Sequence, residues 1–222
     1  MEQSSSGRRI TNKNIYEQTL SDGKIFGEIG PRDINRYRDT AQFIHSDAQS
    51  LLDVGCCTGE WLHHVCRIRE LKEHLGVDVA DNRIQEARRR YPALNLKTGY
   101  VEQLNLQDQS FDTVTCCEVL EHIDDWLSVF HSLFRYARLQ VLITVPYREN
   151  IVETVCIHCG EATPLYGHLR SYTEETFPQV DGWNLRFGKI KDRNPRASNA
   201  RRFYRFFRPH YPWLVASYVC HR

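Results

Sequence analysis

The segment Leu51-Leu52-Asp53-Val54-Gly55-Cys56-Cys57-Thr58-Gly59-Glu60-Trp61 predicts a buried strand that leads through a glycine turn into a helix. Its apolar residues are first consecutive and then, from Trp61 onward, recur at helical spacing. Glycine has no Cβ, so the backbone of such a turn can approach a ligand closely. An acid and a glycine turn at the carboxyl end of a buried strand indicate a nucleoside or nucleotide site, although such turns also occur without a ligand.

Further along the chain, strand-like and helix-like segments alternate, which is typical of a parallel, doubly wound sheet with right-handed crossovers. The expected strands are 74–79, 94–97, 111–117 and 139–145, and the expected helices are 31–43, 83–90 and 126–136. Two final strand-like segments, 183–190 and 213–220, have no ordinary crossover helix between them and predict an antiparallel pair at the sheet edge. We therefore expect an α/β fold: a Rossmann-like, mostly parallel sheet with an antiparallel last strand and helices on both faces.

The expected domain organisation is simple. Residues 1–30 are polar and read as a flexible tail, and residues 31–222 are long enough for one domain with a buried core. Segments 147–180 and 191–212 interrupt the alternation and are expected to be insertions on the substrate side. The helix after Pro31 is expected to be a lid or a dimer contact.

Composition excludes several classes of protein. The 222 residues are 41% hydrophobic and 26% charged, close to the globular average, and the net charge of +1 favours no polyanionic partner. No apolar run approaches the roughly 20 residues that span a bilayer, so we expect no membrane association. The start carries no export signal and four of the eight cysteines form adjacent pairs, which predicts reduced thiols and a cytoplasmic location.

Asp78 strengthens the nucleoside prediction. It ends the second expected strand about twenty residues after the glycine turn, where a carboxylate accepts the ribose hydroxyls of a bound adenosine. The alternative is that Asp78 only caps the following helix. The sequence has no phosphate-binding lysine and no paired-glycine pyrophosphate turn, which disfavours nucleotide hydrolases and dehydrogenases.

These motifs together resemble the class I S-adenosylmethionine-dependent methyltransferases of the type 11 and type 12 kind. The resemblance runs in order through residues 48–146, with Cys57 standing where the family often has glycine. It implies S-adenosyl-L-methionine as cofactor, the methionine end near Asp53, the ribose at Asp78 and the adenine at Tyr100. The full expected cofactor set is Asp53, Gly55, Cys56, Gly59, Asp78, Val79, Tyr100, Val101, Glu118 and Val119.

The expected catalytic residues are His122 and His168. His122 follows the fourth strand on the substrate side, where an imidazole can accept a proton near neutral pH; the alternative is that Glu121-His122 caps a helix or fixes a loop. The set Glu118, Glu121, His122 and His168 is also similar to the metal site of small-RNA 2′-O-methyltransferases. Because Glu-x-x-Glu-His is widespread in methyltransferases without metal, the sequence assigns no metal ligand.

Other features concern the acceptor. Cys156-x-x-Cys159 suits either zinc or a packed turn, and the Arg-rich and aromatic segment 193–208 suits either an anionic acceptor or a solvated helix. The segment from Pro146 to Tyr172 looks like a bacterial subgroup associated with glycan or secondary-metabolite modification, and predicts His168, Arg170 and Tyr172 at the acceptor entrance. We expect methyl transfer to oxygen of a small polar or sugar-containing acceptor. The alternatives are metal-dependent methylation of RNA and a non-catalytic interaction module of the same fold.

Overall fold

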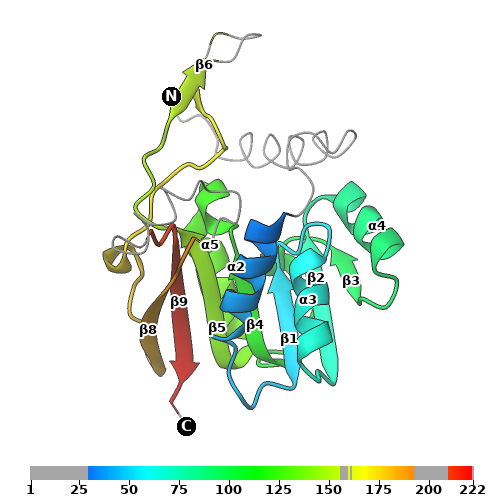
Figure 1. The fold of residues 1–222 in the computed structure, drawn as a ribbon. Coiled ribbons are helices and arrows are strands. Elements are labelled where there is room, and N and C mark those ends of the chain that lie inside the picture. The colour runs from blue at the N-terminus through cyan, green and yellow to red at the C-terminus, as the bar shows by residue number, and fades with distance from the viewer. Residues whose placement is uncertain (1–29, 156–159, 161, 193–209, 222) are drawn as a thin grey trace.

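The computed structural model describes residues 30–155, 160, 162–192 and 210–221. Its centre is a seven-stranded sheet of order β3-β2-β1-β4-β5-β9-β8. All neighbours pair in parallel except β9, which runs antiparallel to both β5 and β8; Figure 1 shows its arrowhead pointing opposite to that of β1. The strands are β1 Ser50–Val54, β2 Glu73–Asp78, β3 Leu96–Thr98, β4 Phe111–Cys117, β5 Ala137–Pro146, β8 Trp183–Ile190 and β9 Trp213–Cys220.

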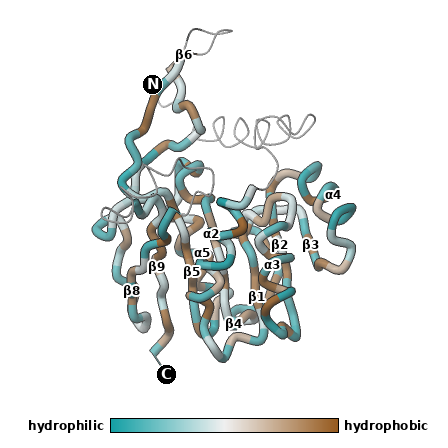
Figure 2. Tube along the Cα trace, viewed as in Figure 1, coloured by the Kyte–Doolittle hydropathy of each residue, from teal (hydrophilic) through white to brown (hydrophobic). Residues whose placement is uncertain are grey.

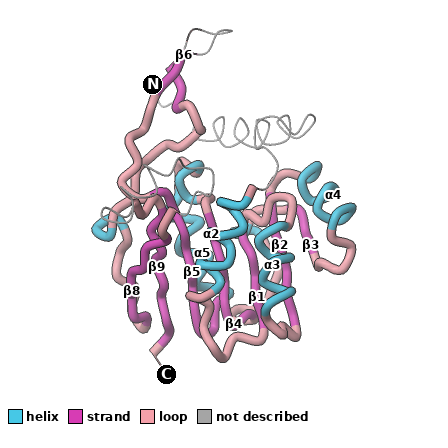
Figure 3. Tube along the Cα trace, viewed as in Figure 1, coloured by secondary structure: helices cyan, strands magenta, loops and turns pink. Residues whose placement is uncertain are grey.

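Helices cover both faces of the sheet, as Figures 1 and 3 show. Helices α2 (Pro31–Ala41), α3 (Glu60–Ile68) and α4 (Asp81–Arg90) bury their apolar residues in one core, together with Leu51, Leu142 and Val215 of the sheet. Helix α5 (Trp126–Tyr136) buries Val129, Phe130 and Leu133 in a second core on the other face. The expected Rossmann-like architecture is confirmed.

Burial differs between the centre of the sheet and its outer helices. Every residue of β1 is buried, because the sheet is covered on both sides. Helix α4 has three consecutive arginines at its end and buries few residues, and Figure 2 shows it as largely hydrophilic beside the hydrophobic β1 and β5. None of the described helices is long and apolar enough to cross a membrane.

A buried glutamine fixes the end of α2 against the sheet. The Gln140 side chain on β5 donates to the carbonyl of Phe43 (2.7 Å) and accepts from the amide of His45 (2.7 Å). Buried polar groups of this kind are retained only where each finds a partner. Because α2 leads into this connection, Gln140 helps to hold α2 over the carboxyl edge of the sheet.

The expected elements agree with the structure in most positions, and β8 and β9 form the expected antiparallel pair at the sheet edge, with β9 between β5 and β8. The third strand begins at Leu96 rather than Leu94, because the Leu94 amide donates to the carbonyl of Tyr91 (3.0 Å) in the turn after α4. A hairpin of β6 (Glu153–Val155) and β7 (Ala162–Pro164) projects from the carboxyl end of the sheet and was not expected, since its side chains are largely exposed and show no hydrophobic alternation.

Two expectations about the ends of the domain lie mostly outside the described residues. The tail 1–30 is described only at Gly30, and the insertion 191–212 only at residues 191–192 and 210–212. The described cysteines are free thiols: Cys56, Cys57, Cys66, Cys116, Cys117 and Cys220. This confirms the expectation for the two adjacent pairs.

Candidate functional site

A cavity of about 500 Å³ opens at the carboxyl ends of β1, β2 and β4. This is the edge at which doubly wound sheets bind their ligands, because neighbouring crossovers diverge there. Its wall includes every expected cofactor residue except Gly59. The acidic residues on the wall are Asp33, Asp53, Glu60, Asp78, Glu102, Glu118, Glu121 and Asp124, and the arginines are Arg36, Arg83 and Arg90. The excess of carboxylates favours a ligand that carries positive charge.

The two glycines of the first turn have different tasks. Gly55 has a φ of 76°, and a Cβ there would lie 2.3 Å from Cγ2 of Val119. Only glycine fits, because both the left-handed backbone and the approach of Val119 exclude a side chain. Gly59 has a φ of 83° and precedes the first residue of α3, and a Cβ there would meet Leu94 instead of the cavity. Gly59 therefore permits the left-handed turn into α3 and does not line the cavity.

Asp53 supplies a buried carboxylate that is only half satisfied. Its Oδ1 accepts from the Thr115 hydroxyl (2.8 Å), whereas its Oδ2 is buried and accepts no hydrogen bond from the described residues. Burial raises the pKa of Asp53 to about 7, and the Thr115 hydrogen bond opposes that rise. A ligand with an ammonium or sulfonium group would compensate this carboxylate, so the site fits S-adenosylmethionine, which carries both.

Asp78 already supports the backbone around the turn. Its Oδ2 accepts from the amide of Cys57 and its Oδ1 from the amide of Ala80, both at 2.9 Å. It is not the N-cap of α4, since that position is Ala80. A carboxylate oxygen accepts more than one hydrogen bond, so Asp78 keeps capacity for the hydroxyls of a ribose. Burial raises the pKa of Asp78.

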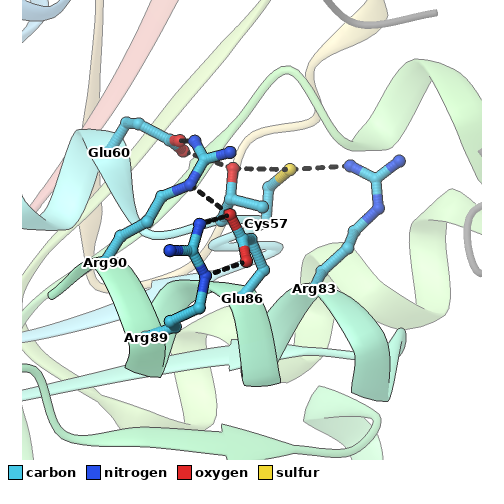
Figure 4. Close-up of polar contacts among 7 residues, drawn as sticks. Cys57, Glu60, Arg83, Glu86, Arg89 and Arg90 are labelled. Atoms are coloured by element: carbon cyan, nitrogen blue, oxygen red, sulfur yellow. Dashed lines mark hydrogen bonds and ion pairs between the residues drawn. The ribbon is translucent and has the colours of Figure 1, made fainter. Parts of the chain in front are cut away.

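Cys57 occupies the position where glycine is more usual, and it does so with a φ of 50°. Its sulfur lies 3.8 Å from the hydroxyl of Thr58 and 2.7 Å from a guanidinium nitrogen of Arg83; Figure 4 shows the contact with Arg83. Burial nevertheless raises the pKa of the Cys57 thiol, so it stays protonated at neutral pH. In the same view Arg90 joins Glu60 of α3 to Glu86 of α4, which ties together the two helices beside the cavity.

Helix α2 contributes residues that the sequence did not assign to the site. Asp33, Arg36, Tyr37 and Thr40 all line the cavity. Their spacing of three, four and seven residues places them on one helical face, and that polar stripe was the signal available in the sequence. Arg36 lies 3.5 Å from Glu118 and 5.5 Å from the centre of the Trp213 ring, so α2 covers the cavity through a contact with the loop after β4.

Glu118 links the cofactor side of the cavity to its far end. It has a φ of 58°, an uncommon backbone conformation for a non-glycine residue, and its Oε1 accepts from the Thr144 hydroxyl (3.0 Å). Burial raises the pKa of Glu118, and the Arg36 guanidinium opposes that rise. Strained residues of this kind persist where their surroundings hold them, often at functional sites.

Beyond Glu118, the expected catalytic residues His122 and His168 come together although they are distant in sequence. Their ring centres are 4.7 Å apart, and both residues line the cavity. His122 Nδ1 donates to the carbonyl of Gly167 (3.1 Å), and His168 Nδ1 lies 2.5 Å from Oε2 of Glu149. Burial lowers the pKa of His122 to about 4, with a further contribution from His168. At neutral pH His122 is therefore an uncharged, weak base.

A network of backbone contacts holds these two histidines in place. The amide of Leu169 donates to the carbonyl of Glu121 (2.7 Å), and the Arg170 guanidinium donates to the carbonyls of Leu120, Ile123 and Asp124. We refer to this set of contacts as the Arg170 clamp. The alternative that Glu121-His122 caps a helix is wrong, because Asp125 caps α5 through the amide of Ser128 (3.3 Å).

Arg170 and Tyr172 were expected at the acceptor entrance, and the structure corrects this. Neither residue lines the cavity. Arg170 points at backbone carbonyls, and Tyr172 is fully buried beside Trp126 and Phe177 in the core under α5. A tyrosine and an arginine near a site look the same in sequence whether they face the ligand or support the wall. Cys156, Cys159 and the arginine-rich segment 193–208 lie outside the described residues.

Comparison with known proteins was consistent with this geometry. Residues 52–143 match the family model described as a methyltransferase domain. The ubiquinone biosynthesis O-methyltransferase of Alkalilimnicola ehrlichii is 32% identical over 97 residues, which cover 41% of this chain and 38% of that protein. This chain spans about two fifths of the length of the curated relatives it matches (40%, 38% and 43%).

Solved structures extend the likeness of the fold to almost the whole chain. The complex of the Haloferax volcanii Trm112 methyltransferase activator with a methyltransferase matches with a TM-score of 0.68, at 15% identity, over 93% of this chain and 98% of that one. The DhpI complex with S-adenosylhomocysteine matches with a TM-score of 0.65, at 16% identity, over 98% of both chains. With its glycine turn, its buried acids and this sheet order, the chain has the fold of S-adenosylmethionine-dependent methyltransferases, and its residues 52–143 match the methyltransferase domain.

Proposed function

We propose that this protein transfers a methyl group from S-adenosylmethionine to an oxygen atom of a small polar or sugar-containing acceptor. The observation that carries the proposal is one continuous cavity: it starts at the half-satisfied carboxylate of Asp53 and ends at the pair His122 and His168. A donor site and an acceptor site in one cavity are what a direct transfer requires.

The cofactor would be held by the residues that the resemblance implies. Asp53 Oδ2 meets the positively charged methionine end, and the Gly55 turn lets the backbone approach it. Asp78 receives the ribose hydroxyls, with Val79, Tyr100 and Val101 beside the adenine. Cys56, Glu118 and Val119 complete the cavity wall. Gly59 does not contact the cofactor and acts through the left-handed turn that begins α3.

Methyl transfer from this cofactor requires mainly that the protein align the acceptor oxygen with the methyl group. S-adenosylmethionine supplies a methyl group on a positively charged sulfur, whose bond to carbon breaks as carbon bonds to the acceptor oxygen, leaving a neutral thioether. The acceptor hydroxyl loses its proton in the same process, and the unprotonated Nε2 of neutral His122 accepts it. The protein therefore gains rate mainly by holding the oxygen in line and excluding water. His122 and His168 are the catalytic residues in the sense that they contact the acceptor.

Two other functions make different predictions. Methylation of a ribose hydroxyl of RNA would require a divalent metal, for which the resemblance gives Glu118, Glu121, His122 and His168 as ligands. A non-catalytic interaction module would keep the fold without binding the cofactor. Segment 147–180, which brings His168 to the cavity and carries the exposed β6–β7 hairpin, is proposed as the acceptor-side insertion in either enzyme.

The experiment that tests the proposed function is calorimetric titration of the full chain with S-adenosylmethionine and with S-adenosylhomocysteine. One equivalent of ligand is expected to bind with micromolar affinity, and Asp78→Ala is expected to weaken it. Incubation with hydroxylated acceptors and labelled cofactor should then show label in the acceptor. A folded wild type that binds neither ligand would refute the methyltransferase proposal and favour the interaction module.

A further inference from the structure

We propose that Arg36 of helix α2 binds a carboxylate group of a ligand inside the cavity, in exchange for its ion pairs with Asp33 and Glu118. The carboxylate belongs either to the amino-acid end of the cofactor or to the acceptor. The cofactor source goes beyond the proposed function, whereas the acceptor source rests on it. Helix α2 lies outside residues 52–143, so the match to the methyltransferase domain does not assign this contact.

The first observation is the charge of the cavity wall. Eight acidic residues and three arginines of the described chain line it. S-adenosylmethionine brings a carboxylate as well as its ammonium and sulfonium groups. A carboxylate that enters a wall of like charge loses its water and is repelled, unless a cation or several hydrogen-bond donors receive it. The three arginines are the candidates for that cation.

The second observation is that Arg36 has the longest ion pairs of the three. Its Nη atoms lie 3.5 Å from Glu118 and 3.7 Å from Asp33, which is longer than an ordinary hydrogen bond from nitrogen to oxygen. Its Nε is buried and donates to none of the described residues. The other two arginines of the wall have contacts of 2.7 and 2.8 Å. Turning Arg36 toward a ligand would therefore break two long ion pairs and no short hydrogen bond.

The third observation is the way in which α2 presents this side chain. The guanidinium carbon of Arg36 lies 5.5 Å from the centre of the Trp213 ring, and that of Arg32 lies 4.8 Å from the same ring. Arg32 also pairs with Asp192, just beyond β8 (3.3 Å). These contacts hold α2 over the sheet before a ligand binds. A site that is preformed in this way loses less conformational entropy on binding.

The chemistry of the guanidinium indicates a carboxylate as its ligand. Its N–H groups form a planar fork that matches the two oxygens of a carboxylate, and arginine stays charged over the whole working pH range. In the ligand-free protein, Asp33 and Glu118 approach this fork from two sides. A ligand carboxylate competes with them, and the guanidinium stays paired throughout the exchange, which avoids the cost of a buried charge without a partner.

The test is calorimetric titration of the full chain with two ligands that differ only in the carboxylate. These are S-adenosylhomocysteine and its decarboxylated analogue, which keeps the adenosine, the thioether and the amino group. The wild type is expected to bind S-adenosylhomocysteine at least about tenfold more tightly than the analogue. In Arg36→Gln this advantage should disappear, so that the two affinities agree within about twofold. Because the ratio is measured within each variant, a general loss of stability does not affect it.

The matched control is Arg32→Gln. It removes an arginine that belongs to the same helix and contacts the same tryptophan but does not line the cavity. It should keep the ratio of the wild type. Asp33→Asn removes one of the two competing carboxylates, so it should bind S-adenosylhomocysteine more tightly than the wild type does, and the decarboxylated analogue no more tightly. Weaker binding of S-adenosylhomocysteine by Asp33→Asn would overturn the exchange.

A carboxylate on the acceptor gives a different pattern. Arg36→Gln would then leave the ratio of the two cofactor analogues unchanged. It would instead weaken the binding of glucuronate, but not of glucose, to the protein saturated with S-adenosylhomocysteine. No effect of Arg36→Gln on either pair of ligands, or an equal effect of Arg32→Gln, would overturn the proposal and leave the proposed function standing. A folded wild type that binds no S-adenosylhomocysteine would instead refute the proposed function.

Discussion

The two halves of the cavity are built in different ways. In the cofactor half, each functional residue lies within two residues of the end of a strand: Asp53 and Gly55 at β1, Asp78 at β2, and Tyr100 after β3. In the acceptor half, Glu121 and His122 meet His168 from a segment beyond β5, and the Arg170 clamp holds them together. The first half is a product of local strand-turn units, and the second is a product of long-range contacts.

This difference predicts how each half fails. A change in the cofactor half should act on ligand affinity through the turn itself. A change in the acceptor half should act first on the contacts between segments, and leave the cofactor site largely intact.

Gly55→Ala should have the largest effect. The added Cβ meets Val119 at 2.3 Å and the backbone is held at a φ of 76°, so we expect a loss of about 2–4 kcal/mol in the free energy of unfolding. Binding of S-adenosylmethionine should fall below detection by calorimetry. Val119→Ala is the matched background: it removes the contact but not the backbone strain, so Gly55→Ala should cost less in it. An equal cost in both backgrounds would contradict the steric part of this explanation.

Asp53→Asn should weaken S-adenosylmethionine at least about thirtyfold, because it removes the charge that faces the methionine end. In the wild type, affinity should rise between pH 6 and 8, since the pKa of Asp53 is about 7 and the ionised form binds. Thr115→Val removes the hydrogen bond that stabilises the ionised form, so it should move this transition to higher pH. An affinity that does not change with pH in the wild type would argue against Asp53 as the partner of the positive charge.

The same residue predicts a pH dependence of stability with a definite sign. The pKa of Asp53 is raised from 3.8 in the unfolded chain to about 7 in the folded protein. Its contribution to the stability of the ligand-free protein is therefore full below about pH 4 and is lost as pH rises from about 4 to about 7. The stability of Asp53→Asn relative to the wild type should accordingly rise between pH 4 and 7 and stay level above pH 7, measured by thermal denaturation without cofactor.

Arg170→Gln should have an intermediate effect on the acceptor half. It breaks hydrogen bonds from a charged group to the carbonyls of Leu120, Ile123 and Asp124, which we expect to cost about 1–3 kcal/mol of stability. Affinity for S-adenosylmethionine should change little, as calorimetry would show. A large loss of cofactor affinity in a folded variant would show that the two halves are not independent.

Arg89→Ala should have the smallest effect. Arg89 pairs with Glu86 on the exposed side of α4, and exposed pairs of this kind contribute little to stability. We expect no measurable change in the free energy of unfolding and unchanged binding of S-adenosylmethionine. A larger change in stability or binding would mean that the ion pairs of Figure 4 act together and that losing Arg89 also disturbs Arg90 and Glu60 at the cavity.

The sequence by itself determined the cofactor half and the sheet. Strands buried on both faces produce continuous apolar runs, and a glycine turn directly after a strand is visible as a contiguous pattern, so β1, β4 and α5 lie where the sequence places them. The positions of Asp53, Gly55 and Asp78 at the cavity follow from their places at strand ends.

Only the tertiary structure decided the acceptor half. No local pattern distinguishes His168, which faces the cavity, from Arg170 and Tyr172, which support its wall, because all three stand within five residues of one another. Arg36 gains its place only because α2 packs over the carboxyl edge of the sheet. The physical reason is the same in each case: these side chains are positioned by contacts with distant segments, and the energy of such contacts leaves no periodic signal in the neighbouring sequence.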